Sequence, residues 1–229
     1  MFETKYSKIL TVLLVIIIII AIIGIFGYLG YSYYKKYTIS NDADKYVSTY
    51  VEETKNTTTE SQNNTTTTEN SDGNISGELA TVNTSSSNSS NKVKTYKGYN
   101  VLGTIEIPKT NVKYPVLEGP SDNRLEVAVA VDYPYKDVKL NTVGNVTIAG
   151  HNYRNGTFFS DNNKLSNGDK IYITDSDGKK LEYVVYNKFI ADFKDRSYDN
   201  RDTDGKKEIT LYSCTDDMAG RLIVEARAE

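Results

Sequence analysis

The chain has 229 residues, a formal net charge of −3 and a pI near 5.4. It has no cluster of lysine and arginine of the kind that neutralises phosphates, so a nucleic-acid partner has no electrostatic support. A single cysteine, Cys214, excludes an intramolecular disulfide and any multi-cysteine metal site, and His151 is the single histidine. Any chemistry that pairs a thiol with an imidazole therefore has one candidate of each kind.

A long apolar run follows the first residues. Residues 9–29 read ILTVLLVIIIIIAIIGIFGYL without a charge, and such a segment spans about 31 Å as a helix, enough for a bilayer core. An aromatic and basic stretch with Tyr33, Tyr34 and Lys35 comes next, where a cleaved signal peptide would have small residues. We predict a tail over residues 1–8 and a retained transmembrane helix over residues 9–31. Lysines flank the helix on both sides, so the charges alone do not decide its orientation.

The next segment is polar. Stretches such as NTTTESQNNTTTTENS and NTSSSNSSN hold almost no side chains able to fill a core. The sequence therefore predicts a flexible linker rich in Asn, Ser and Thr over residues 32–95.

Residues 96–229 have a different sequence pattern. Short runs of β-branched and aromatic residues end at Gly, Asn, Asp or Pro, which is typical of an all-β domain. Eight strands are expected, near residues 101–107, 113–116, 128–131, 145–149, 170–174, 181–193, 208–214 and 221–226. One short helical piece is expected over residues 157–165. Closing eight strands into a barrel would remove exposed sheet edges, so we predict a closed β-barrel.

Three residues with chemical potential lie at expected strand ends. His151 follows the strand in NVTIAGHN, Cys214 ends the strand in ITLYSCTD, and Arg221 begins the last strand in MAGRLIVEA. A thiolate is a nucleophile, an imidazole exchanges protons with an amine, and a guanidinium stabilises an oxyanion. This chemistry needs no metal or cofactor. From spacing alone a second interpretation stays open, in which the three are a loop histidine, a buried strand cysteine and a surface cation.

An acidic loop is expected between the sixth and seventh strands, around residues 195–207. It holds Asp195, Asp199, Asp202 and Asp204. Their spacing does not match a known calcium loop, so a solvated acidic loop is favoured and calcium binding is the minor alternative.

Several segments resemble the sortase family. TLYSC is similar to the family's TLxTC signature, with Ser213 where a Thr is usual, and an Arg begins the next strand. AGHN resembles the segment with the family's catalytic His, and LGTIEIPKTNVKYPVLEG resembles its early strands. The similarity covers about residues 99–226, with His, Cys and Arg in the family's order.

The resemblance implies an eight-stranded β-barrel catalytic domain over residues 96–229, outside a Gram-positive-type cell, with a cytoplasmic N-terminus. It implies that Cys214 attacks an LPxTG-like sorting signal of a surface protein or pilin. His151 would then transfer protons, and Arg221 would hold substrate and oxyanion. The acyl group would pass to an amine of a peptidoglycan precursor or pilin. The subfamily resembles class B or class D, although no long helical insertion between strands six and seven supports class B. A cysteine hydrolase and a non-catalytic tethered adhesin remain as rival functions.

Overall fold

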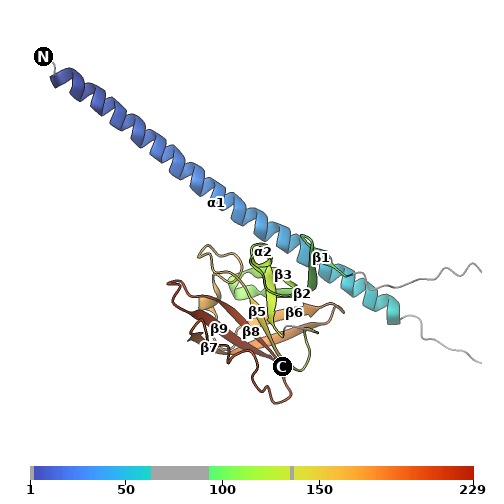
Figure 1. The fold of residues 1–229 in the computed structure, drawn as a ribbon. Helices are drawn as coiled ribbons and strands as arrows, with labels where there is room; N and C mark the ends of the chain where they lie inside the picture. Colours follow the sequence, from blue (N-terminus) through green and yellow to red (C-terminus); the bar gives the residue numbers. More distant parts are fainter. Residues whose placement is uncertain (1–2, 63–92, 135–136) are drawn as a thin grey trace, which may run out of the picture. The chain divides into compact units, whose positions relative to one another are not determined.

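The structure, a computed structural model, describes residues 3–62, 93–134 and 137–229. The chain divides into two compact units, Met1–Asp42 and Ala43–Glu229. A long helix, α1 (Glu3–Gln62), contributes residues to both units. All strands belong to the second unit (Figure 1).

The first unit contains a candidate membrane helix. Within the described residues, one helical stretch, Leu10–Thr54, is long and apolar enough to cross a bilayer, with a window of mean hydropathy 3.3. Its apolar side chains, such as Ile17 and Phe26, are exposed. Exposed apolar side chains on a helix of this length are suited to lipid contact. The predicted bounds of the membrane segment, residues 9–31, stay a prediction.

The structure differs from the predicted linker over residues 32–62, which are helical. Ala43, Val47, Tyr50 and Thr54 are buried in the second unit, and their spacing of three or four residues places them on one helix face. Packing of this face supplies the stability that the polar composition does not. The rest of the predicted linker lies largely outside the described residues.

This docked face of α1 contacts the barrel through mixed chemistry. Tyr50 packs with Tyr96 and Leu117 in one apolar cluster, and its hydroxyl donates to the Asp175 carbonyl at 3.2 Å. Lys113 Nζ lies 2.6 Å from Asp44 Oδ1. Residues 43–54 are therefore a part of the barrel's fold.

The predicted closed eight-stranded barrel is confirmed. The strands are β2 (Tyr99–Ile107), β3 (Val112–Leu117), β4 (Val129–Tyr133), β5 (Gly144–Ala149), β6 (Lys170–Asp175), β7 (Lys180–Ala191), β8 (Lys207–Cys214) and β9 (Arg221–Ala228). They are ordered β2-β3-β4-β5-β8-β9-β7-β6, and pairing of β2 with β6 closes the barrel (Figure 1). A two-residue strand, β1 (Thr95–Tyr96), adds to β2. Fully buried Ile148, Leu211 and Val224 contribute to the core.

The helical segments in the barrel are short. They are η1 (Pro108–Thr110), α2 (Asp122–Leu125) and η2 (Asn162–Lys164). The helix expected over residues 157–165 is reduced to η2, because Phe158 has a φ of +50°, and a right-handed helix cannot run through a left-handed residue. α2 was not predicted; the Ser121 side chain caps it by accepting from the Arg124 N–H.

Candidate active site

The three candidate residues come from neighbouring strands at one rim of the barrel. β5 and β8 are parallel, with Ala149 paired to Tyr212, so both strands end at this rim. β8 and β9 are antiparallel, and Cys214 is the direct partner of Arg221. Side chains of directly opposed residues project from the same face of a sheet. The fold thus brings His151, Cys214 and Arg221 to one rim, while their catalytic roles remain predictions.

His151 stands on an aromatic surface just after β5. Its ring centroid is 4.9 Å from that of Tyr153 and 6.5 Å from that of Phe158. The Tyr153 hydroxyl donates to Glu126 Oε1 at 2.5 Å. Burial and this hydrogen bond raise the pKa of Tyr153 above its usual range. The Tyr153 hydroxyl is therefore a neutral donor at physiological pH. Its hydrogen bond to Glu126 holds the Tyr153 ring beside the His151 imidazole.

Gly150, between β5 and the histidine segment, lies close against a buried ring. Its N–H donates to the Tyr212 carbonyl at 3.1 Å. A Cβ at this position would lie 2.6 Å from Cδ2 of Phe159, a side chain that is fully buried. Only glycine fits this close approach without displacing the ring.

Asn152 connects the histidine segment to the cysteine segment. Its Nδ2 donates to the Cys214 carbonyl at 2.9 Å and to Asp216 Oδ1 at 2.8 Å, and its Oδ1 accepts from the Arg154 N–H at 3.0 Å. Asn152 lies in the AGHN segment and was not among the residues predicted to have a role. Its position next to His151 is the one signal that pointed to it.

Cys214 is a free, half-buried thiol at the end of β8. A tight turn follows it, in which the Thr215 N–H donates to the Gly220 carbonyl at 2.9 Å. The Thr215 hydroxyl donates to Asp217 Oδ1 at 2.6 Å, and this bond, with one from the Ala219 N–H, lowers the pKa of Asp217. The turn is what sets Arg221 directly opposite Cys214.

Arg221 is held between two tyrosines. Its Nη1 donates to the Tyr198 hydroxyl at 2.9 Å, and its Cζ lies 4.9 Å from the Tyr212 ring centroid. The Tyr212 hydroxyl donates to Asp132 Oδ2 at 2.7 Å. Burial raises the pKa of Tyr212 above its usual range and raises that of Tyr198, which the arginine partly opposes. Both hydroxyls are thus protonated at neutral pH, so Tyr198 offers the guanidinium a neutral oxygen as acceptor.

The acidic loop predicted around residues 195–207 lies between β7 and β8. Its carboxylates bind groups of the loop itself: Asp195 accepts from the Ser197 N–H, Asp202 from the Asp204 N–H, and Asp199 from Arg196 Nε. In the described part of the chain, no three His, Cys, Asp or Glu side chains are arranged to hold a metal ion. The solvated acidic loop remains the prediction, with calcium binding as its minor alternative.

A thiol, an imidazole and a guanidinium at one rim can supply a nucleophile, a proton carrier and an oxyanion partner. That combination suits acyl transfer at a carbonyl carbon. His151 follows β5, Cys214 ends β8 and Arg221 begins β9, so the barrel, not local sequence, gathers them.

Comparison with known proteins agrees with this geometry. Residues 105–229 match the sortase domain family model. The chain is 32% identical over 127 residues to sortase A of Bacillus anthracis, covering 54% of this chain and 58% of that protein. It superposes on sortase A from Corynebacterium diphtheriae with a TM-score of 0.51 and 28% identity, covering 57% of this chain and 61% of that one. For a sortase D5 transpeptidase from Clostridium perfringens the values are 0.50 and 26%, covering 57% and 79%.

The match spans less than two thirds of the first two of these proteins. The family model nevertheless matches more than half of this chain, including the rim with His151, Cys214 and Arg221. The chain belongs to the sortase family.

Proposed function

We propose that the protein is a sortase transpeptidase that cleaves a sorting-signal peptide through a thioester on Cys214 and passes the acyl group to an amine. The observation that supports this most is the cross-strand pair of Cys214 and Arg221, with His151 following the neighbouring parallel strand. The match to the sortase domain model over the same residues adds to it.

In the proposed first half-reaction, the Cys214 thiolate attacks the carbonyl carbon of the scissile bond. The Arg221 guanidinium stabilises the oxyanion that forms. The carbon–nitrogen bond then breaks, and His151 gives a proton to the departing amine. The product is a thioester between Cys214 and the sorting signal.

In the second half-reaction, an incoming amine attacks the thioester carbonyl and His151 accepts its proton. The carbon–sulfur bond breaks, which returns the Cys214 thiolate and leaves an amide. These three side chains account for every bond and proton that moves, so the proposed reaction includes no metal or cofactor.

The proposed substrate is an LPxTG-like sorting signal of a surface protein or pilin, and the proposed amine belongs to a peptidoglycan precursor or a pilin. The candidate membrane helix supports a protein anchored in the cell membrane. In the proposed orientation the N-terminus is cytoplasmic and the barrel is extracellular. The matched relatives include sortase A and sortase D proteins, so a single class is not proposed.

A cysteine hydrolase with the same side chains is the rival reaction. It differs in the second step, where water replaces the amine and an acid replaces the amide. Which product forms is set by whether an amine captures the thioester faster than water does.

The test uses the full chain in detergent with a panel of LPxTG-like quenched peptides. Each peptide is incubated with and without a glycine or diaminopimelate amine, and mass spectrometry identifies the products. We expect an amide product that is lost in Cys214→Ala. An acid product alone would support the hydrolase, and a chain whose surface function survives Cys214→Ala would be an adhesin.

A further inference from the structure

The Arg221 guanidinium, which also lies over the Tyr212 ring, is oriented by one hydrogen bond. In the part of the chain that the structure describes, Tyr198 is the one side chain that hydrogen-bonds the Arg221 guanidinium, at 2.9 Å. Tyr198 is 2% exposed and packs with Ala191 and Ile223. Because an arginine side chain has several free torsions, this fixed acceptor decides which of its rotamers is populated.

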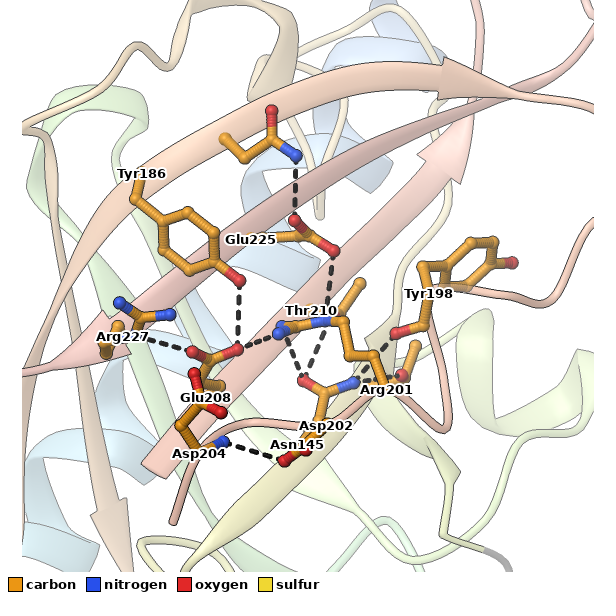
Figure 2. Close-up of polar contacts among 12 residues, drawn as sticks. Asn145, Tyr186, Tyr198, Arg201, Asp202, Asp204, Glu208, Thr210, Glu225 and Arg227 are labelled. Carbon is orange, nitrogen blue, oxygen red and sulfur yellow. Dashed lines mark hydrogen bonds and ion pairs between the residues drawn. The ribbon is translucent and has the colours of Figure 1, made fainter. Parts of the chain in front are cut away.

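Tyr198 lies in the loop of residues 192–206 between β7 and β8. A side chain of the barrel hydrogen-bonds to its backbone. Asn145, in β5, donates from Nδ2 to the Tyr198 carbonyl at 3.0 Å and to the Asp199 carbonyl at 2.9 Å (Figure 2). Asn145 is 8% exposed, and its Oδ1 accepts from Thr210 Oγ1 at 3.0 Å. A side chain bonded on both sides in this way cannot rotate without breaking buried hydrogen bonds.

Arg201 anchors the same loop after Tyr198. It forms an ion pair with Glu208, whose side chain is fully buried, and its Nε lies 3.0 Å from Glu225 Oε1 (Figure 2). Glu208 also accepts from Arg227 Nε at 2.6 Å and from the Tyr186 hydroxyl at 2.9 Å. Removing Arg201 would take an ion-pair partner from both Glu208 and Glu225, which are buried, so this cluster holds the loop in one place.

Arg196 anchors the loop before Tyr198. Its Nη1 lies 2.7 Å from Asp132 Oδ2, the same oxygen that accepts from the Tyr212 hydroxyl. The Arg196 Cζ lies 5.6 Å from the Tyr198 ring centroid and 5.7 Å from that of Tyr212. The two tyrosines that contact Arg221 are thus themselves joined through Arg196 and Asp132.

We propose that Tyr198 is a positioning residue for Arg221, and that the buried anchors of the 192–206 loop serve to hold its hydroxyl in place. By accepting one N–H of the guanidinium, Tyr198 fixes the plane of the group beside Cys214. The remaining N–H groups stay available to an oxyanion. The effect on catalysis rests on the role proposed above for Arg221; the effect on the position of its charge does not.

The test compares Tyr198→Phe with Tyr183→Phe in the full chain. Both changes remove a hydroxyl from a buried tyrosine, since Tyr198 is 2% and Tyr183 1% exposed. The Tyr183 hydroxyl donates to Asn141 Oδ1 at 3.1 Å, so it bonds neither to Arg221 nor to an anchor of the 192–206 loop. We expect kcat/KM for the peptide to fall about tenfold in Tyr198→Phe and to stay within about twofold of the original in Tyr183→Phe. In an Arg221→Ala background, Tyr198→Phe should cause no further loss, because the residue it positions is gone.

A second measurement needs no peptide. Cys214 is modified with an anionic and with a cationic methanethiosulfonate of similar size, and the ratio of the two rates is taken. A guanidinium fixed beside the thiol favours the anionic reagent, so the ratio of the anionic to the cationic rate should fall about threefold or more in Tyr198→Phe and stay unchanged in Tyr183→Phe.

The two measurements separate the possible failures. If the original chain transfers no acyl group but the ratio falls in Tyr198→Phe alone, the proposed function is wrong and the positioning role stands. An unchanged ratio together with an unchanged kcat/KM in Tyr198→Phe would overturn the positioning role. So would a tenfold loss that persists in the Arg221→Ala background.

Discussion

The side-chain amide of Asn152 donates a hydrogen bond to the backbone carbonyl of Cys214 at 2.9 Å. This bond joins two segments that are far apart in the sequence, and it starts from the residue directly after His151. Because the acceptor is the backbone carbonyl of Cys214, the proposed nucleophile, a movement of the histidine segment also displaces the cysteine segment. The distance between thiol and imidazole is therefore controlled from outside the pair.

Replacing Asn152 by alanine should slow acyl transfer more than it destabilises the fold. We expect kcat/KM to fall about tenfold, the equivalent of ~1.4 kcal/mol, because the two segments lose their direct link. The free energy of unfolding should change by no more than ~1 kcal/mol, since the site is partly exposed.

The matched control is Asn155→Ala in the same segment. Asn155 Oδ1 accepts from the Thr157 N–H at 3.0 Å and from its hydroxyl at 2.7 Å, so its side chain is also hydrogen-bonded but is not linked to Cys214. Steady-state kinetics give kcat/KM for both variants, and urea unfolding gives their free energies of unfolding. Equal losses of kcat/KM in the two variants would contradict a special role for Asn152.

Replacing Gly150 by alanine should damage both stability and rate. The added Cβ would lie 2.6 Å from a buried ring carbon of Phe159, and overpacking of this kind costs about 1–3 kcal/mol. The displaced backbone would carry His151 with it. Adding Phe159→Leu should reduce the cost of Gly150→Ala, measured as the difference in unfolding free energy within a double-mutant cycle. Simple additivity of the two changes would show that the ring is not the obstacle.

Ser213 occupies the place where the family's signature has a threonine. Its surroundings predict how its replacement by alanine would affect stability. The side chain is 1% exposed, and within the described residues its Oγ has no hydrogen-bond partner. Burying an unpartnered hydroxyl is unfavourable, so Ser213→Ala should leave the unfolding free energy unchanged or raise it by up to ~1 kcal/mol. The rate of peptide cleavage should be retained. A loss of activity in an equally stable Ser213→Ala would give the hydroxyl a role in the reaction.

The strands of the barrel could be predicted because each is a short run of β-branched and aromatic residues between turn residues. The pairing that builds the site is of a different kind, since β5 and β8 are parallel neighbours separated by two other strands in sequence. His151 and Cys214 could be found because each is the single residue of its type, and Arg221 because it begins the last expected strand and fits the family's signature. Asn152 and Tyr198 could not be found, because their roles depend on backbone and side-chain partners that only folding brings near. Tyr198 was one of 19 tyrosines.

The docked part of α1 should loosen at alkaline pH. Burial, with the nearby Glu53 carboxylate, raises the pKa of Tyr46 to about 12, whereas a tyrosine in the unfolded chain ionises near 10. The neutral form is favoured in the folded state, so its contribution to stability is fully present below about pH 10 and is lost towards pH 12.

Urea unfolding of the full chain at pH 8 and pH 11 measures this loss. Tyr46→Phe keeps the ring and removes the titrating group, so it should lose less stability than the original chain over the same interval. Identical losses would mean that other groups alone account for the alkaline sensitivity.

The turns of α1 from Ala43 to Thr54 also decide where the barrel can be cut from its anchor. They cover an apolar cluster that includes Tyr96, Val101 and Leu117. A truncated chain beginning at residue 93 would uncover this cluster, and bare apolar patches drive self-association. A truncated chain beginning at residue 43 keeps the part of α1 that covers this cluster, and it should remain monomeric in the absence of detergent. The smallest separable catalytic unit therefore begins within the helix, well before the first strand.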